Sequence, residues 1–214
     1  MLEARGLSAG YGRAQVLFGL DLAVDKGEVV ALLGRNGAGK STTLKALMGL
    51  IEPRSGEVRF GGERIDRRSP HEVARLGLGY VPEDRRIFTD LTVAENLEVG
   101  RQPPRPDAPS WSTEKLIALF PTLGGLLRRR GGSMSGGEQQ MLCIARTLAG
   151  NPKAVLLDEP SEGLAPVIVD QVAAAILEMK WAGVAVFLAE QSARFTERVA
   201  DRGYRLEKGK ISSA

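Results

Sequence analysis

The residue types that carry most acid-base and metal chemistry are almost missing from this sequence. Among its 214 residues there is one histidine, His71, and one cysteine, Cys143. With so few of these side chains, we find no convincing Ser-His-Asp triad, Cys-His pair or metal cluster. A disulfide within the chain is impossible, which fits a reducing compartment. Cys143 lies on the apolar side of a predicted helix, where core packing is its expected role.

Long apolar runs and a strong charge imbalance are missing too. No apolar run reaches the length needed to cross a bilayer, and the first residues lack the pattern of a signal peptide. The 29 Lys and Arg residues barely exceed the 26 Asp and Glu residues, which gives no argument for a nucleic-acid partner. An apolar fraction of 43% is sufficient for a packed core.

A glycine-rich loop joins a predicted strand, residues 28–33, to a predicted helix, residues 42–50. The loop reads Gly-Arg-Asn-Gly-Ala-Gly-Lys-Ser, the pattern of a P-loop that cradles ATP or GTP. Its glycines let the backbone take positive φ and approach a polyphosphate at the helix N-terminus. Lys40 adds a charge for the β and γ phosphates, and the Ser41 hydroxyl can hold Mg²⁺. The candidate nucleotide-binding residues are Gly34, Asn36, Gly37, Ala38, Gly39, Lys40, Ser41 and Thr42. A glycine-rich turn with an incidental lysine is the alternative.

Two acidic residues end a second buried-strand pattern, residues 153–157. Asp158 and Glu159 follow it directly, at the edge where open α/β sheets bind their ligands. We expect Asp158 to hold the water shell of Mg²⁺ and Glu159 to orient or deprotonate the attacking water. Solvated acids before Pro160 would explain the same pattern without catalysis.

The segment Ser-Gly-Gly-Glu-Gln-Gln, residues 135–140 (the signature segment), has two interpretations. Ser135 and Glu138 form the pattern of a capping box at a helix start. Backbone amides at such a helix start also suit a phosphate, which another subunit would have to supply. The two interpretations are compatible, since the cap would orient the amides.

In this order, the P-loop, the signature segment and the Leu-Leu-Asp-Glu-Pro stretch resemble the nucleotide-binding subunit of an ABC transporter over essentially the whole chain. The resemblance implies an α/β fold: a P-loop NTPase core with an N-terminal antiparallel β subdomain and an inserted, mainly helical subdomain that carries the signature segment. We expect one ABC ATPase domain over residues 1–214, with residues 1–82 and 151–214 in the core and antiparallel part and about 84–150 in the helical part.

The resemblance also assigns roles to individual residues. Two subunits would sandwich ATP and Mg²⁺, with Ser135, Gly136, Gly137 and Glu138 of one facing the nucleotide on the P-loop of the other. Tyr11 would stack on adenine with Val16 nearby, although Tyr11 also suits the edge of an antiparallel sheet. ATP hydrolysis would drive two transmembrane permease subunits from the cytoplasmic face of the membrane, and a periplasmic or extracellular substrate-binding protein would take part indirectly.

Four positions depart from the common ABC pattern. Glu83 stands where most members carry a glutamine that touches Mg²⁺, and Glu138 closes the signature in place of glutamine. Gln191 stands where a histidine normally contacts the γ-phosphate; its amide can donate a hydrogen bond but cannot become a cation. Ala165 replaces an aspartate that bridges the two subunits.

Together these departures resemble the ATP-binding subunits of branched-chain amino acid importers, and most closely the second, shorter ATPase of that system. Urea and short-chain amide importers use similar subunits, and Glu83 favours the amino acid branch. Glu162 stands where that branch suggests an apolar residue. Relatives usually add a final helix after the stretch that ends at Ile211, so we expect a truncated or divergent end.

Three other classes remain as alternatives. A soluble ABC ATPase of DNA repair or translation usually has a coiled-coil insertion or tandem copies, and neither is visible. A P-loop kinase or GTPase would leave the signature segment unexplained. A regulatory module that binds nucleotide without hydrolysis is the stronger rival, because the switch histidine and the bridging aspartate are missing.

Overall fold

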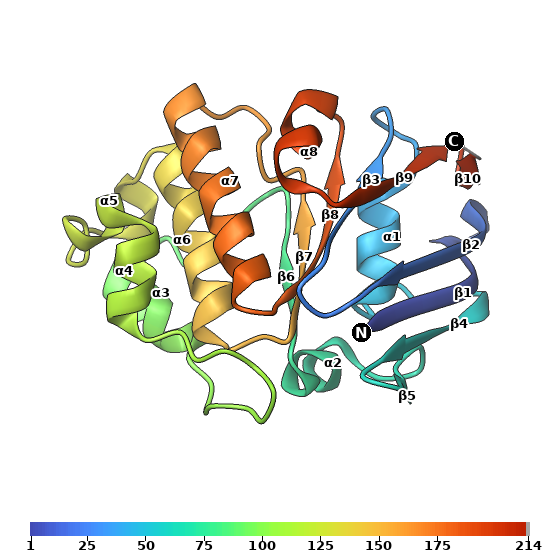
Figure 1. Ribbon diagram of the computed structural model, residues 1–214, viewed down its shortest axis with the longest axis horizontal. Helices are drawn as coiled ribbons and strands as arrows, with labels where there is room; N and C mark the ends of the chain where they lie inside the picture. Colours follow the sequence, from blue (N-terminus) through green and yellow to red (C-terminus); the bar gives the residue numbers. More distant parts are fainter. Residues whose placement is uncertain (213–214) are drawn as a thin grey trace.

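An antiparallel sheet forms one end of the molecule in the computed structural model, which describes residues 1–212 (Figure 1). Its strand order is β2-β1-β4-β5. The strands are β1 Leu2–Tyr11, β2 Ala14–Val24, β4 Ser55–Phe60 and β5 Glu63–Arg64. Gly12, with φ +52°, permits the tight turn between β1 and β2. Leu2 and Ala4 are buried on one face, so this sheet has a core side and an outer side.

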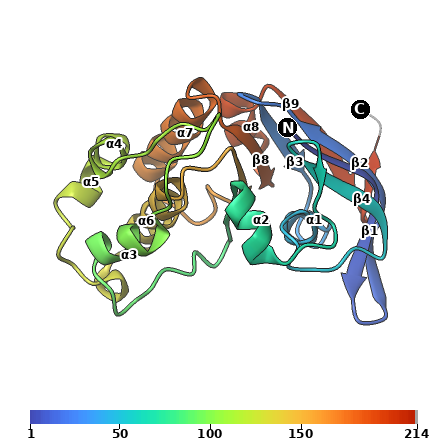
Figure 2. The same cartoon turned by 90° about the horizontal axis from the view of Figure 1, so that it is seen from below.

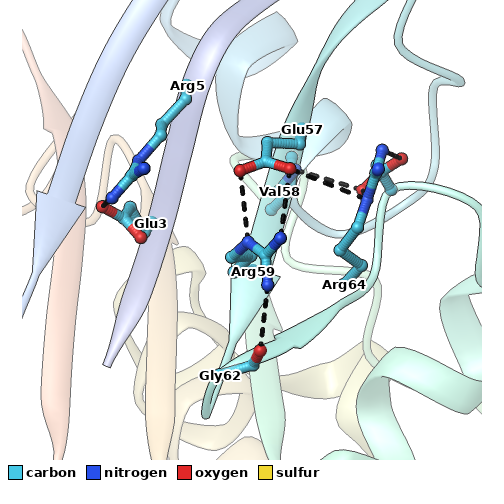
Figure 3. A network of polar contacts seen from close by, with 8 residues as sticks. Glu3, Arg5, Glu57, Val58, Arg59, Gly62 and Arg64 are labelled. Carbon is cyan, nitrogen blue, oxygen red and sulfur yellow. Dashed lines mark hydrogen bonds and ion pairs between the residues drawn. The ribbon is translucent and has the colours of Figure 1, made fainter.

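Charged side chains pair across the outer side of this sheet (Figure 3). Arg59 Nε lies 3.1 Å from Glu57 Oε1, and Arg5 Nη2 lies 2.7 Å from Glu3 Oε1. Arg64 Nε approaches Glu57 Oε2 at 3.9 Å. Exposed ion pairs of this kind add little to stability, because water and salt screen them. Their main effect is to keep this face polar, which leaves the opposite face to pack inward.

A second, mostly parallel sheet runs through the middle of the molecule. Its order is β10-β9-β3-β8-β7-β6, with β10 antiparallel to β9. The strands are β3 Val29–Leu33, β6 Leu78–Val81, β7 Ala154–Asp158, β8 Ala185–Glu190, β9 Arg202–Glu207 and β10 Lys210–Ser212. β3, β7 and β8 are nearly continuous apolar runs because both of their faces are covered.

Helices cover the two faces of the parallel sheet (Figures 1 and 2). The helix α1 lies between the two sheets, and most of the other helices gather on the far side of the parallel sheet, as Figure 2 shows from below. The helices are α1 Lys40–Leu47, α2 Pro70–Leu76, α3 Val93–Gly100, α4 Thr113–Leu119, α5 Pro121–Gly124, the 3₁₀ turn Gly131–Ser133, α6 Gly136–Ala149, α7 Pro166–Trp181 and α8 Ala193–Val199. None of the helices in the described part of the chain is long and apolar enough to cross a membrane.

Alternating side chains of the central strands feed two separate cores. Val155 and Leu157 on β7 face the core made with α6 and α7, whereas Ala154 and Leu156 face the core around α1. The first core also takes in Leu97 of α3, so the helical part is packed onto the sheet by apolar contact. The predicted division near residues 82–84 and 150–151 stays a prediction, and its last two residues lie outside the described part.

Several predicted helix starts and ends can be compared with the structure. Ser135 Oγ accepts from the Glu138 amide at 3.3 Å and Glu138 Oε2 accepts from the Ser135 amide at 2.7 Å, which confirms the capping box. The helix expected over residues 42–50 is α1, which begins two residues earlier because Gly39, with φ +112°, already opens it.

The turn between β9 and β10 is bonded to the P-loop. Gly209 donates its amide hydrogen to Ala38 O at 2.9 Å and accepts at its carbonyl from Phe18 N at 2.9 Å. A Cβ atom at Gly209 would collide with the carbonyl oxygen of Val16. The hairpin therefore rests on β2 and on the P-loop, without any space for a side chain.

Candidate nucleotide-binding site

The P-loop, residues 34–41, connects β3 to α1 in the way that the sequence predicted. Gly37 has φ +78° and Gly39 has φ +112°, conformations that a side chain would strain. Gly39 is the N-cap residue of α1, and no side chain caps the helix start. The first amides of α1 are therefore free to meet a phosphate.

The expectation of positive φ is wrong for Gly34, and the reason is packing. A Cβ atom at this position would lie 2.6 Å from Leu206 O on β9. Its neighbour Ala38 is almost fully buried and accepts the Gly209 amide at its carbonyl. Gly34 and Ala38 pack the P-loop against β9 and β10. They could bind a ligand only through their backbone groups.

Lys40 forms a buried ion pair with Glu159. Its Nζ lies 2.8 Å from Glu159 Oε1, and the two side chains are only 4% and 7% exposed. Lys40 Nζ also donates to Gly34 O at 2.8 Å and to Arg35 O at 3.2 Å. Glu159 has φ +49°, which turns the chain sharply at the end of β7 and brings its carboxylate to the P-loop.

Asp158 joins three elements at the same edge of the sheet. Its Oδ1 accepts from Ser41 Oγ at 2.9 Å, and its Oδ2 accepts from the Tyr80 hydroxyl at 3.1 Å. Burial raises the pKa of Asp158, and the hydrogen bonds from Ser41 and Tyr80 partly oppose that rise. Burial, followed by the Asp158 charge, raises the pKa of Tyr80, so this hydroxyl stays a donor.

A cavity of about 310 Å³, here the nucleotide cavity, lies over the P-loop. It brings together predicted residues from β2, the P-loop, the loop after β6 and the end of β7. The lining residues are Val16, Asn36, Gly37, Gly39, Lys40, Ser41, Thr42, Glu83, Glu159 and Glu162. Burial and then the charges of Glu159 and Glu83 raise the pKa of Glu162. Glu162 thus belongs to the acidic wall of the cavity, at a position where the resemblance suggested an apolar residue.

The oxygen atoms around Ser41 fit a Mg²⁺ ion that also binds phosphate. Ser41 Oγ and Asp158 Oδ1 are hard oxygen donors already 2.9 Å apart, and Glu83 lines the same cavity. Within residues 1–212, no group of three or more His, Cys, Asp or Glu side chains could hold a metal by itself. Mg²⁺ usually binds through few protein ligands together with substrate phosphates, so Ser41, Asp158 and Glu83 are the residues that would hold it.

Tyr11 lies at the rim of this region. The side chain is half exposed, and its hydroxyl lies 3.5 Å from Thr42 Oγ1 at the start of α1. Val16 lies on the wall of the nucleotide cavity itself. The stacking of Tyr11 on adenine, with Val16 nearby, stays a prediction.

Gln191 lines a second cavity of about 710 Å³, here the side cavity. The two cavities share Glu159 and Glu162, so Gln191 and the P-loop approach Glu159 from different sides. Ala165, where the resemblance expected an aspartate in most members, is the N-cap residue of α7 and makes no side-chain cap.

The signature segment lies at the start of α6, outside both cavities. Ser135 is exposed, and no residue of the signature segment lines the nucleotide cavity or the side cavity. Gly136 lies against the Arg85 guanidinium, where a Cβ atom would be 2.8 Å from Nη1. At Gly137, a Cβ atom would be 3.0 Å from Ile168. Both glycines therefore allow close packing around the helix start.

Two polar residues near this sheet edge, Tyr80 and Glu190, are not among the candidate site residues predicted above. Tyr80 lies one residue before the end of β6 and pairs with Leu156 of β7, and Glu190 ends β8, where its carboxylate is buried. The available signal was a polar residue at the end of an apolar strand that points to the same edge as Asp158.

This combination of a parallel sheet, a P-loop and paired acids at the strand ends defines the chain as a P-loop nucleotide-binding protein. The particular family follows from comparison with known proteins. The sequence model of the ABC transporter family matches residues 17–162, and the chain belongs to that family. It is therefore an ABC transporter ATPase, as the resemblance predicted.

Relatives match over nearly their whole length. The branched-chain amino acid transport ATP-binding protein BraG of Pseudomonas aeruginosa is 44% identical over 99% of this chain and 91% of its own. A probable branched-chain amino acid transport ATP-binding protein, LivF, of Archaeoglobus fulgidus is 32% identical over 99% and 90%. The lipopolysaccharide export ATP-binding protein LptB of Haemophilus influenzae is 36% identical over 99% and 88%.

Solved structures agree on the fold. The structure of an ATP-binding subunit of an ABC transporter matches with a TM-score of 0.84 and 30% identity, covering 100% of this chain and 88% of the other. A nucleotide-free ATP-binding cassette matches with a TM-score of 0.85 and 27% identity, covering 100% and 90%. The predicted P-loop NTPase fold is thereby confirmed.

Proposed function

We propose that this chain powers the uptake of branched-chain or related amino acids as the ATP-hydrolysing subunit of an importer. The observation that carries the proposal is the 44% identity to BraG over 99% of the chain. The joint occurrence of Glu83, Glu138 and Gln191 supports the same branch. Lipopolysaccharide export is the second candidate, because LptB proteins match at up to 36% identity over a similar length.

The residues of the nucleotide cavity divide the work of binding and hydrolysis. The P-loop amides and Lys40 would hold the β and γ phosphates of ATP. Ser41, Asp158 and Glu83 would hold Mg²⁺, which neutralises phosphate charge during the transfer. Glu159 would orient or deprotonate the attacking water, and Gln191 would donate a hydrogen bond to the γ-phosphate.

The Lys40 and Glu159 ion pair supports a change of partners when ATP binds. The two charges neutralise each other inside the cavity at 2.8 Å. A phosphate that takes over Lys40 would free the Glu159 carboxylate to accept a hydrogen bond from water. ATP binding and the activation of Glu159 as the base would then occur in the same step.

The position of the signature segment supports assembly with a second ATPase subunit, either an identical copy or a sister chain. Its exposed Ser135 and the capped start of α6 lie outside the nucleotide cavity of the same chain. A second subunit could bring its own ATP to these amides, and the signature segment would then complete the partner's site.

Docking to permease subunits would place the chain at the cytoplasmic face of the membrane. A groove of about 580 Å³ between α2, α3 and α6 exposes the apolar side chains of Leu50, Phe88 and Val99. Arg105 and Arg146 line the same groove. An apolar permease segment with acidic flanks would fit this surface.

The proposal is tested in proteoliposomes that contain this chain, its sister ATPase if one exists, the permease subunits encoded beside it and the cognate binding protein. We expect phosphate release and uptake of labelled leucine, isoleucine or valine to depend on each other. Lys40→Ala should abolish both. Coupling to urea or amides, or extraction of lipopolysaccharide in place of uptake, would reject amino acid import.

A further inference from the structure

A buried carboxylate at the end of β8 connects three loops of the site. Glu190 is 1% exposed, and its Oε1 accepts from Ser161 N at 3.1 Å and Ser161 Oγ at 2.5 Å. Its Oε2 accepts from Gln191 N at 3.0 Å and Ser192 N at 3.2 Å. Its backbone carbonyl accepts from Gly34 N of the P-loop at 3.3 Å. Among the ion pairs of residues 1–212, none includes Glu190.

All four donors to this carboxylate are neutral, and three of them are backbone amides. Only a group without hydrogens on its oxygens can accept all four bonds. A glutamine NH₂ group facing Gln191 N and Ser192 N would lose both bonds, and one facing Ser161 would lose the bond to the amide while the hydroxyl could turn to accept. Aspartate is shorter by one methylene group and would not span the same distance. The site therefore requires glutamate for its shape as well as its charge.

The two sides of the carboxylate hold the two loops that matter for hydrolysis. Ser161 follows Glu159 by two residues, so the bonds on Oε1 fix the turn in which Glu159 takes φ +49°. The bonds on Oε2 fix the backbone at Gln191 and at Ser192, the N-cap residue of α8. Ala189 O adds a bond from the Glu159 amide at 3.0 Å.

We infer that Glu190 is a positioning residue for ATP hydrolysis, which sets the separation between Glu159 and Gln191. The inference rests on the proposed roles of these two residues. It explains how a neutral Gln191 can replace a histidine at this position. Because the Gln191 amide cannot become a cation, its hydrogen bond to the γ-phosphate depends on the side chain being held in the correct place. A shift of the catalytic groups by about 1 Å can cost on the order of 100-fold in rate.

The test compares Glu190→Gln with wild type in the assembled transporter. We expect kcat to fall by about tenfold to hundredfold while KM for ATP stays within about twofold. Ser161→Ala, which removes one of the bonds to Oε1, should lower kcat by a smaller factor. The double variant should be no slower than Glu190→Gln alone, because both changes loosen the same link. Glu197→Gln, an exposed glutamate on α8, is the matched control.

Three results would overturn the inference. They are a wild-type kcat in folded Glu190→Gln, an equal loss of kcat and nucleotide affinity together with a lower melting temperature, and additive effects in the double variant. Glu159→Gln is measured in parallel. If it keeps wild-type turnover, the assignment of the base fails; if it is inactive while Glu190→Gln is normal, only the positioning role fails.

Discussion

The ion pair between Lys40 and Glu159 allows a quantitative prediction for Glu159→Gln. Removing one partner of a buried pair costs about 3–5 kcal/mol, because the other charge stays buried without compensation. Lys40 keeps its bonds to Gly34 O and Arg35 O, so we expect the lower end, about 3 kcal/mol. For a domain of this size about 1 kcal/mol corresponds to about 2–4 °C, so the nucleotide-free variant should melt about 6–12 °C lower.

Nucleotide should remove most of this difference. A phosphate compensates Lys40 in the variant as well as in wild type, whereas wild type must first break its ion pair. The variant should therefore gain more thermal stability than wild type from a non-hydrolysable ATP analogue with Mg²⁺. Circular dichroism melting curves with and without the analogue measure both effects.

A double variant separates the ion pair from general damage. Lys40→Met together with Glu159→Gln removes both charges and should be more stable without nucleotide than Glu159→Gln alone. The reasoning is refuted if Glu159→Gln melts at the wild-type temperature without nucleotide, or if the deficit is the same with and without the analogue.

Three further predictions concern other parts of the molecule. Because burial raises the pKa of Asp158, its charged form opposes folding at neutral pH, and Asp158→Asn should raise the melting temperature without nucleotide. That gain should shrink as the pH falls through the raised pKa, where wild type becomes protonated; a constant gain across the pH range would argue against it. Gly34→Ala should lower the free energy of unfolding by about 1–3 kcal/mol in urea, since its Cβ would crowd Leu206 O, and an unchanged midpoint would contradict the packing role. Burial raises the pKa of Cys143 to about 11, so iodoacetamide should label this thiol near neutral pH only when denaturant opens the core; fast labelling of the folded chain would show that it is accessible.

The sequence was most informative where function depends on neighbouring residues. The P-loop, the acids at the end of β7 and the capping box of Ser135 and Glu138 are local patterns; the structure has the P-loop and the cap where they were predicted, and Asp158 is the last residue of β7, one position inside the strand. Strand ends were also accessible, because apolar runs of β3, β7 and β8 stop where polar residues begin.

The remaining features depend on contacts between distant parts of the chain. Lys40 and Glu159 are far apart in sequence, and only the order of β3, β8 and β7 in the sheet brings them together. The role of Glu190 depends on the turn at Ser161, and the role of Gly34 depends on β9. A pattern of residue types cannot specify such contacts before the sheet order is known.

Gly209 illustrates what this means for tolerance to mutation. It lies outside both cavities and bonds to Ala38, yet any side chain there would strike the Val16 carbonyl. In a saturation screen for ATPase activity, this turn should therefore behave like a residue of the P-loop, with no accepted replacement. The positions sensitive to mutation would then include residues that only support the P-loop by packing as well as residues that contact nucleotide. Position 209 would be an example of the first kind, since it does not line the nucleotide cavity.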